Sequence, residues 1–236
     1  VPEHFPSNII NIAALFNTYL NLNQDISMWD VPNVKIFDFV FSMQGIAFNQ
    51  PLNSWDVSSA TSMRSLFEGA TNFNHPLDNW NVSNVTDMSN MFYRATAFNQ
   101  DISMWDVSNV NTMQSMFRGA TVFDQDISLW NVAKVNDMSR MFRGATSFNQ
   151  DLSYWCVELI TSLPVEFDLC ATNWTLPRPV WGTCPQSVSN VVLLMNADNG
   201  FINVIDGSTI DANGNTIVSA VAADILPKFD SDNFFH

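Results

Sequence analysis

The sequence predicts an α/β repeat protein built from about six copies of a 25-residue unit. The first observation is the spacing of six tryptophans, which fall 26, 25, 25, 25 and 25 residues apart at Trp29, Trp55, Trp80, Trp105, Trp130 and Trp155. The second is that a phenylalanine follows each of them 12 residues later. A fixed period of this kind indicates one supersecondary unit stacked on copies of itself, because a single unit is too small to bury its own apolar face.

Each unit is predicted to contain one short strand and one short helix. Apolar and polar residues alternate in Trp105–Val107, which is typical of a strand, whereas the apolar residues of Val110–Phe117 recur at helical spacing. The polar pair Ser108–Asn109 between them supplies side-chain oxygens that cap a helix start. Gly119 then provides a left-handed turn back toward the next repeat.

Two polar columns precede the tryptophans. One holds aspartates, and Pro51 and Pro76 replace them in two repeats, so turn capping through Asx-type hydrogen bonds is predicted rather than catalysis. The other column is predicted to form an internal polar ladder that satisfies backbone groups. The aspartates are Asp25, Asp101, Asp126 and Asp151, and the ladder comprises Asn23, Asn49, Asn74, Asn99, Asp124 and Asn149.

No set of residues predicts an active site. His75 occupies a column that otherwise holds glutamine, and no nucleophile or base recurs beside it. We therefore expect a protein that is not an enzyme and that holds no metal and no cofactor. With 9 Lys and Arg against 23 Asp and Glu, the net charge of −14 excludes nucleic acid, whose binding needs a basic surface.

The N-terminal segment, residues 1–21, is predicted to be a capping half-repeat. Its longest apolar run, Ile9–Leu20, contains asparagines and a threonine and is too short and too polar for insertion into a membrane. Val1 is expected to be a processed or truncated end, since neither an initiator methionine nor a signal-peptide pattern is present.

The repeats, residues 22–155, resemble a known family. The apolar spacing of Ile102–Val110 resembles a leucine-rich repeat in which Trp and Val replace the leucines. The run FNQDIS-x-WDVSNV-x-x-M-x-x-MF, followed by GAT-x-FNQ, is similar to the BspA-like leucine-rich repeat surface proteins, and the likeness covers about Leu15–Pro185. The resemblance implies a right-handed leucine-rich-repeat-like solenoid at a cell or particle surface, used for adhesion and recognition without catalysis.

Residues 156–185 resemble the C-terminal cap of that family, which implies a disulfide between Cys156 and Cys184. Such a bond indicates an oxidising, extracellular setting. Cys170 is left over, and it is either buried and inert or paired with another chain.

Residues 186–236 form a second, β-rich segment, because the Trp and Met columns stop after Pro185. Strands are predicted at Val191–Met195, Phe201–Ile205 and Thr216–Ala220. The segment loosely resembles the opening hairpins of a laminin-G or concanavalin-like jelly roll. Such a domain needs more strands, so we expect an incomplete sheet or one that partner chains complete.

If the Trp and Val side chains point inward, the alternate residues form one exposed strand face. We predict that this face is the contact surface, and a plain solvated sheet is the alternative. On the opposite edge lie Arg94, Arg118, Arg140 and Arg143, so the array is charge-polarised, which could favour lateral packing of like chains. The face comprises Met28, Asp30, Ser54, Asp56, Asn79, Asn81, Met104, Asp106, Leu129, Asn131 and Tyr154.

These features favour a non-enzymatic structural and recognition protein that is extracellular, at a cell surface or a virion surface. The expected partner is a protein or glycan receptor on another surface, and a homo-oligomer or larger assembly is compatible with the pattern. A viral appendage or particle component is preferred, because an incomplete β segment after a capped array fits a modular assembly subunit. The alternatives are a bacterial cell-surface adhesin and a carbohydrate-binding module, the latter weakened because Tyr154 is the one aromatic residue on the face.

Overall fold

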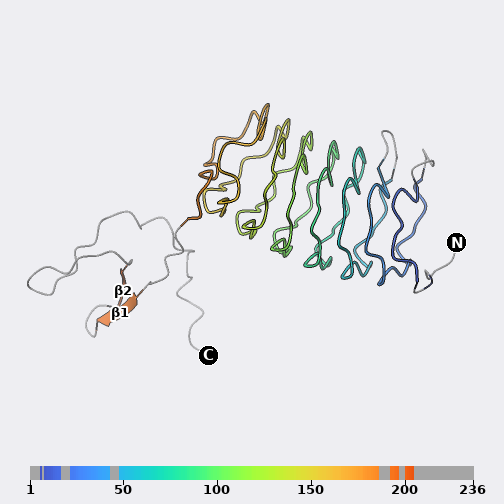
Figure 1. Ribbon diagram of the computed structural model, residues 1–236, viewed down its shortest axis with the longest axis horizontal. Helices are drawn as coiled ribbons and strands as arrows, with labels where there is room; N and C mark the ends of the chain where they lie inside the picture. Colours follow the sequence, from blue (N-terminus) through green and yellow to red (C-terminus); the bar gives the residue numbers. More distant parts are fainter. Residues whose placement is uncertain are drawn as a thin grey trace, which may run out of the picture. The chain divides into compact units, whose positions relative to one another are not determined.

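The computed structural model describes residues 6, 8–16, 22–42, 48–185, 192–196 and 200–204. The chain divides into two compact units, Val1–Pro185 and Gln186–His236. The first unit is a stack of coils, each one repeat long, which Figure 1 shows side by side from the blue to the orange part of the chain. We call this unit the coil stack.

Single parallel bridges join each coil to the next. Because bridge partners lie 25 or 26 residues apart, one sequence repeat makes one complete coil. The bridges form a continuous series through Asn11, Ile36, Ser62, Asp87, Thr112 and Asp137.

The prediction of an α/β repeat, a right-handed leucine-rich-repeat-like solenoid with one strand and one helix in each unit, is wrong. In the part of the coil stack that the structure describes there is no helix and no strand, only turns and single bridges. Val110–Phe117, the predicted helix, is a run of turns: the Met116 amide donates to the Met113 carbonyl at 3.1 Å. Ser115 has a φ of 55°, a left-handed conformation that an α-helix does not accommodate.

The amides that a helix would use internally bind the next coil instead. Met113 donates to Asp137 at 2.9 Å, Ser115 to Ser139 at 2.8 Å and Phe117 to Met141 at 2.9 Å. Positive φ recurs in the column of Ser115, at Ser65, Asn90 and Arg140, so the coils share this geometry. Each turn advances the chain by three residues, so a run of turns gives nearly the same apolar spacing as a helix.

The inward direction of the Trp and Val columns is confirmed, although the segment is not a strand. Trp105 is 4% exposed and Val107 is 1% exposed. The Trp105 indole Nε1 donates to the Leu77 carbonyl of the preceding coil at 3.0 Å. The same bond, at 2.9 to 3.1 Å, recurs at Trp55, Trp80, Trp130 and Trp155. Tryptophan therefore fills the core and satisfies a backbone carbonyl in the neighbouring coil.

Stacked aromatic rings run through the core. Phe92 lies 5.7 Å from Phe117, which lies 5.7 Å from Phe142, between ring centroids. A second ladder places Phe98 at 6.1 Å from Phe123. This second ladder continues to Phe148 and ends there, because the Trp174 ring lies edge-on to Phe148, with centroids 4.8 Å apart and planes at 85°. Aromatic pairs of this kind contribute about 0.5 to 1.5 kcal/mol each beyond the area that they bury.

The polar ladder and the Asx caps are also confirmed, although the ladder residues are exposed or half-buried rather than internal. Asn99 donates its amide to the Asn74 side-chain Oδ1 at 2.9 Å, and the Asn99 Oδ1 accepts from the Asp124 amide at 2.9 Å. In the other column, the Asp101 Oδ1 accepts the Ser103 amide at 2.9 Å, and Asp25, Asp126 and Asp151 make the equivalent bond. Side chains thus satisfy the backbone groups that irregular coils leave unpaired.

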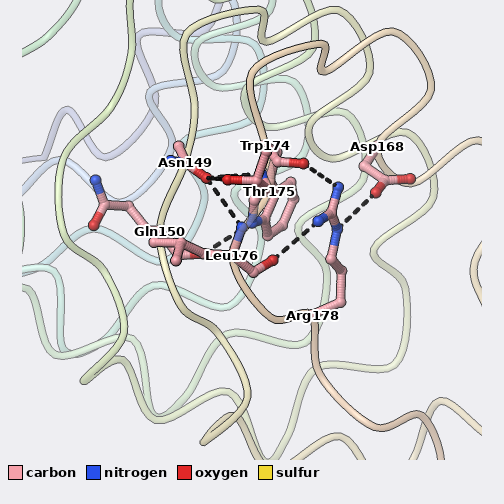
Figure 2. A network of polar contacts seen from close by, with 7 residues as sticks. All are labelled: Asn149, Gln150, Asp168, Trp174, Thr175, Leu176 and Arg178. Carbon is pink, nitrogen blue, oxygen red and sulfur yellow. Dashed lines mark hydrogen bonds and ion pairs between the residues drawn. The ribbon is translucent and has the colours of Figure 1, made fainter.

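The last coil is closed by a polar network around Arg178, which Figure 2 shows from close by. The Arg178 guanidinium donates to the Trp174 carbonyl at 2.9 Å and pairs with Asp168 at 3.0 Å. It also lies 4.4 Å from the centroid of the Trp174 ring. The Asn149 Oδ1 accepts the Thr175 amide at 2.8 Å, which extends the polar ladder into the cap.

In the second unit the structure describes one antiparallel hairpin of two strands, β1 (Val192–Asn196) and β2 (Gly200–Val204), with Val192 opposite Val204. They lie within one residue of the first two strands predicted there. The third predicted strand, Thr216–Ala220, lies outside the described residues.

Candidate functional site

All eleven residues of the predicted contact face lie on the surface, although turns rather than strands present them. They form two rows. The outer row contains Met28, Ser54, Asn79, Met104, Leu129 and Tyr154; the Asx row contains Asp30, Asp56, Asn81, Asp106 and Asn131.

The outer row exposes large apolar side chains. Met28 is 78% exposed, Met104 85%, Leu129 89% and Tyr154 58%. The last three lie on successive coils, so they form a continuous apolar strip along this face of the stack. Exposed apolar strips on a soluble surface typically mark contact sites.

The side chains of the Asx row also cap the turns in which they lie. The Oδ1 atom of Asp106 accepts the Ser108 amide at 3.0 Å, and Asp56 and Asn81 make the same bond to Ser58 and Ser83 at 3.0 and 3.1 Å. These bonds hold the side chains in a fixed direction at the surface. In the last coil, Cys156 occupies this column.

Three carboxyl groups near these rows have a pKa below the ordinary value. Hydrogen bonds from the Ser108 side chain and backbone lower the pKa of Asp106. The backbone amide of Ser103 lowers the pKa of Asp101, and that of Ser27 lowers the pKa of Asp25. A hydrogen bond donated to the charged form favours that form, so the surface stays acidic at neutral pH.

Stability should therefore fall in acid. Because the folded-state pKa of Asp25, Asp101 and Asp106 lies below the ordinary 3.8, these groups contribute stability that is present above pH 3.8 and is lost as pH falls through the folded pKa. The double variant Asp101→Asn and Asp106→Asn keeps both caps and should flatten the acid side of the profile. Urea midpoints measured from neutral pH downward test this, and an equally steep profile in the variant would contradict it.

The opposite edge gathers cations. Arg94 and Arg118 flank the Tyr93 ring, with guanidinium carbons 5.1 and 5.0 Å from its centroid. Arg140 and Arg143 both bind Glu166 Oε2, at 2.8 and 2.9 Å. We call Arg94, Arg118, Arg140 and Arg143 the arginine edge.

The arginine edge lowers the pKa of Glu166, and the hydrogen bond from Arg140 is the largest cause. Sequence reasoning predicted the arginines but missed Tyr93 and Glu166. The signal for Tyr93 was present, since it stands in the column of Arg118 and Arg143 and therefore beside them on the stack.

The disulfide that the family resemblance implied for the cap is present. A disulfide joins Cys156 to Cys184. Cys170 is free and exposed, so the interpretation of a buried, inert thiol is wrong. Cys170 has a φ of 66° and stands in a turn position that Gly69, Gly119 and Gly144 occupy in other coils, which keeps its side chain on the surface.

No group of three or more His, Cys, Asp or Glu residues that could hold a metal ion occurs among the residues described. In the same part of the chain, no helix has the length and apolar character needed to cross a membrane.

Comparison with known proteins gives a family. A family model described as "Mycoplasma protein of unknown function, DUF285" matches residues 3–86 and 76–175, most of the coil stack. The chain belongs to the DUF285 family. In general terms DUF285 is the BspA-like repeat family that the sequence resembles, and its description assigns no activity. No curated protein and no solved structure matches the chain.

The DUF285 match ends at residue 175, just before the closing Arg178 and well before Cys184. A further set of exposed apolar side chains lies in this last part of the stack, and sequence reasoning missed it because the column pattern degenerates there. It comprises Leu159, Leu163, Val165, Leu169, Leu176 and Val180.

Proposed function

We propose that the coil stack is a non-enzymatic recognition element that uses the outer row and the Asx row to contact a protein or glycan on another surface. The observation that carries this proposal is the apolar strip of Met104, Leu129 and Tyr154, which are 85%, 89% and 58% exposed. Burying side chains of this size contributes about 1.5 to 3 kcal/mol each. Three neighbours on one strip therefore supply a useful share of a binding energy.

The fixed shape of the surface supports the proposal. The Asx side chains are held by their own turns, as in the 3.0 Å bond from the Ser108 amide to Asp106. Beneath the surface, the Trp105 indole donates to the Leu77 carbonyl of the preceding coil, and the Ile102 carbonyl accepts the Trp130 indole of the following coil. Little conformational entropy is therefore lost when a partner binds. An acidic, apolar surface of this kind suits a partner that offers cations or hydrogen-bond donors beside apolar groups.

The proposed setting is extracellular, at a cell surface or on a virion. The Cys156–Cys184 disulfide supports an oxidising environment. A cell-surface adhesin is the function that the resemblance to the BspA-like surface proteins implies. A viral appendage or particle component is supported by the modular order of a capped stack followed by a β segment. Antibody labelling of intact cells and of purified particles from the native source separates the two.

A triple variant tests the contact surface. Met104→Asn, Leu129→Asn and Tyr154→Asn each install the residue that the same column holds at Asn79, so the fold should survive. As a control, Leu163→Asn and Val165→Asn change side chains that are 62% and 61% exposed elsewhere. Fluorescent full-length protein is titrated onto intact animal cells and onto a glycan array.

We expect saturable binding that the triple variant weakens by about tenfold or more, since anchor residues at a contact typically cost over 1 kcal/mol each when truncated. The control variant should bind like the original protein. Equal binding by the triple variant, or no saturable binding to either target, would contradict the proposal. Binding to the array that Tyr154→Asn alone abolishes would favour a carbohydrate-binding module.

A further inference from the structure

We propose that the arginine edge binds the aspartate column of a second copy of this chain, so that coil stacks associate side by side. The aspartate column is the row of turn caps that precedes each tryptophan, and in successive coils it holds Asp101, Asp126 and Asp151. This contact uses neither the outer row nor the Asx row. It therefore does not depend on the proposed receptor surface.

The arginine edge reverses the charge of the molecule locally. The full chain carries a net charge of −14, yet four of the eight Lys and Arg residues in 1–185 lie on this one edge. Glu166 is bound there by Arg140 and Arg143 at 2.8 and 2.9 Å. Among the described residues, Arg94 and Arg118 make no ion pair, and their guanidinium groups lie against the Tyr93 ring instead. Two positioned cations are therefore available to a partner.

The two rows have the same pitch. Arg118 and Arg143 occupy one column on successive coils, and Arg94 lies one position further along in the coil before them. Asp101, Asp126 and Asp151 occupy one column on three successive coils, and bridges or backbone hydrogen bonds join each coil to the next. Backbones joined in this way lie about 4.8 Å apart. A second copy therefore presents carboxylates at the interval at which the edge presents guanidinium groups.

The carboxylates of the aspartate column are held in position for ion pairs with arginine. The Asp101 Oδ1 accepts the Ser103 amide at 2.9 Å, and Asp126 and Asp151 accept Ser128 and Ser153 at 2.9 Å, so each side chain is held in place while its second oxygen is not used by that bond. Asp101 and Asp126 are exposed and Asp151 is half-buried. Single exposed ion pairs contribute little, so the contact requires the whole row and must be sensitive to salt.

Two variants separate the two halves of the contact. The edge variant, Arg94→Gly and Arg118→Glu, installs the residues found in the same columns at Gly69 and Glu68. The row variant, Asp101→Asn, Asp126→Asn and Asp151→Asn, removes charge but keeps an oxygen for each cap. The control, Lys134→Asn, removes a cation away from the edge and restores the residue present at Asn109.

Sedimentation velocity of the full chain tests the proposal. We expect the original protein and Lys134→Asn to associate in about 0.1 M salt and to dissociate in about 1 M salt, where the Debye length falls to about 3 Å. Each charge variant alone should associate at least about tenfold more weakly while remaining folded at the temperature of the measurement. Mixing the edge variant with the row variant should restore association, because each supplies the surface that the other lacks.

Three results would overturn the proposal. One is a monomeric original protein at low salt, and another is a charge variant that associates like the original. The third is a monomer whose arginine edge binds heparin in a way that the edge variant abolishes, which would assign the edge to a sulfated polyanion rather than to a second copy.

Discussion

Replacing Trp105 with alanine should lower the free energy of unfolding by about 3 to 5 kcal/mol, as for other buried aromatic residues. Trp105 is 4% exposed, and its ring stacks 6.4 Å from that of Trp80 in the preceding coil. The change removes this packing and leaves the Leu77 carbonyl, which now accepts the Trp105 indole at 3.0 Å, without that partner. Chemical denaturation followed by tryptophan fluorescence measures the loss.

Trp105→Phe is the matched control, because it keeps most of the ring but removes the indole donor. Its cost should be about 1 to 3 kcal/mol, the value for one buried acceptor left unsatisfied. Because each coil contacts only its neighbours, both variants should weaken the coils around position 105 first. A near-neutral Trp105→Ala would mean that the Trp column is exposed, and the assignment of the contact surface would then be inverted.

Removing the disulfide should have the next largest effect. Cys156→Ser with Cys184→Ser opens a loop that spans 28 residues in sequence, and the chain-entropy model assigns such a loop about 3 to 4 kcal/mol. The bond lies in the last coil, and among the described residues up to Pro185 no further coil stacks on it. We therefore expect the cap to open before the middle of the stack, which hydrogen exchange resolves coil by coil.

Cys170→Ser is the control for chemistry at the cap, since this thiol is free and exposed. It should leave stability unchanged in oxidising and reducing buffer. If the double serine variant were as stable as the original protein, or if reduction had no effect on the original, the disulfide would not hold the cap.

The sequence predicted which side chains face the core, because burial depends on columns that recur in every repeat. Trp105, Val107 and Phe117 are buried, and Met104 and Asp106 are exposed, as the alternation indicated. It did not predict the backbone. Apolar residues spaced three and four apart indicate which side chains point toward the core. The same spacing fits a helix and a run of turns, so it cannot distinguish the two backbone conformations.

The decisive difference is at positions such as Ser115 and Arg140, where φ is 55° and 59° without glycine in the sequence to signal it. Contacts between columns were also missed. Tyr93 between two arginines and Arg178 over Trp174 depend on how coils stack and on how the cap folds back. The aspartate and asparagine columns were predictable because polar groups at fixed turn positions have few partners other than the local backbone.

Methionine oxidation tests the orientation of the repeats most directly, because methionine stands in both inward and outward columns. Met28 and Met104 are 78% and 85% exposed. Seven others are 0% exposed: Met63, Met88, Met91, Met113, Met116, Met138 and Met141. Full-length protein is treated with dilute hydrogen peroxide, and each methionine is followed by peptide mass spectrometry.

Because sulfoxide formation requires access to the thioether, Met28 and Met104 should oxidise rapidly while the seven buried methionines stay reduced until the protein unfolds. Rapid oxidation of Met113 and Met116, or protection of Met104 in the isolated chain, would contradict the assignment of the outer row as the exposed face.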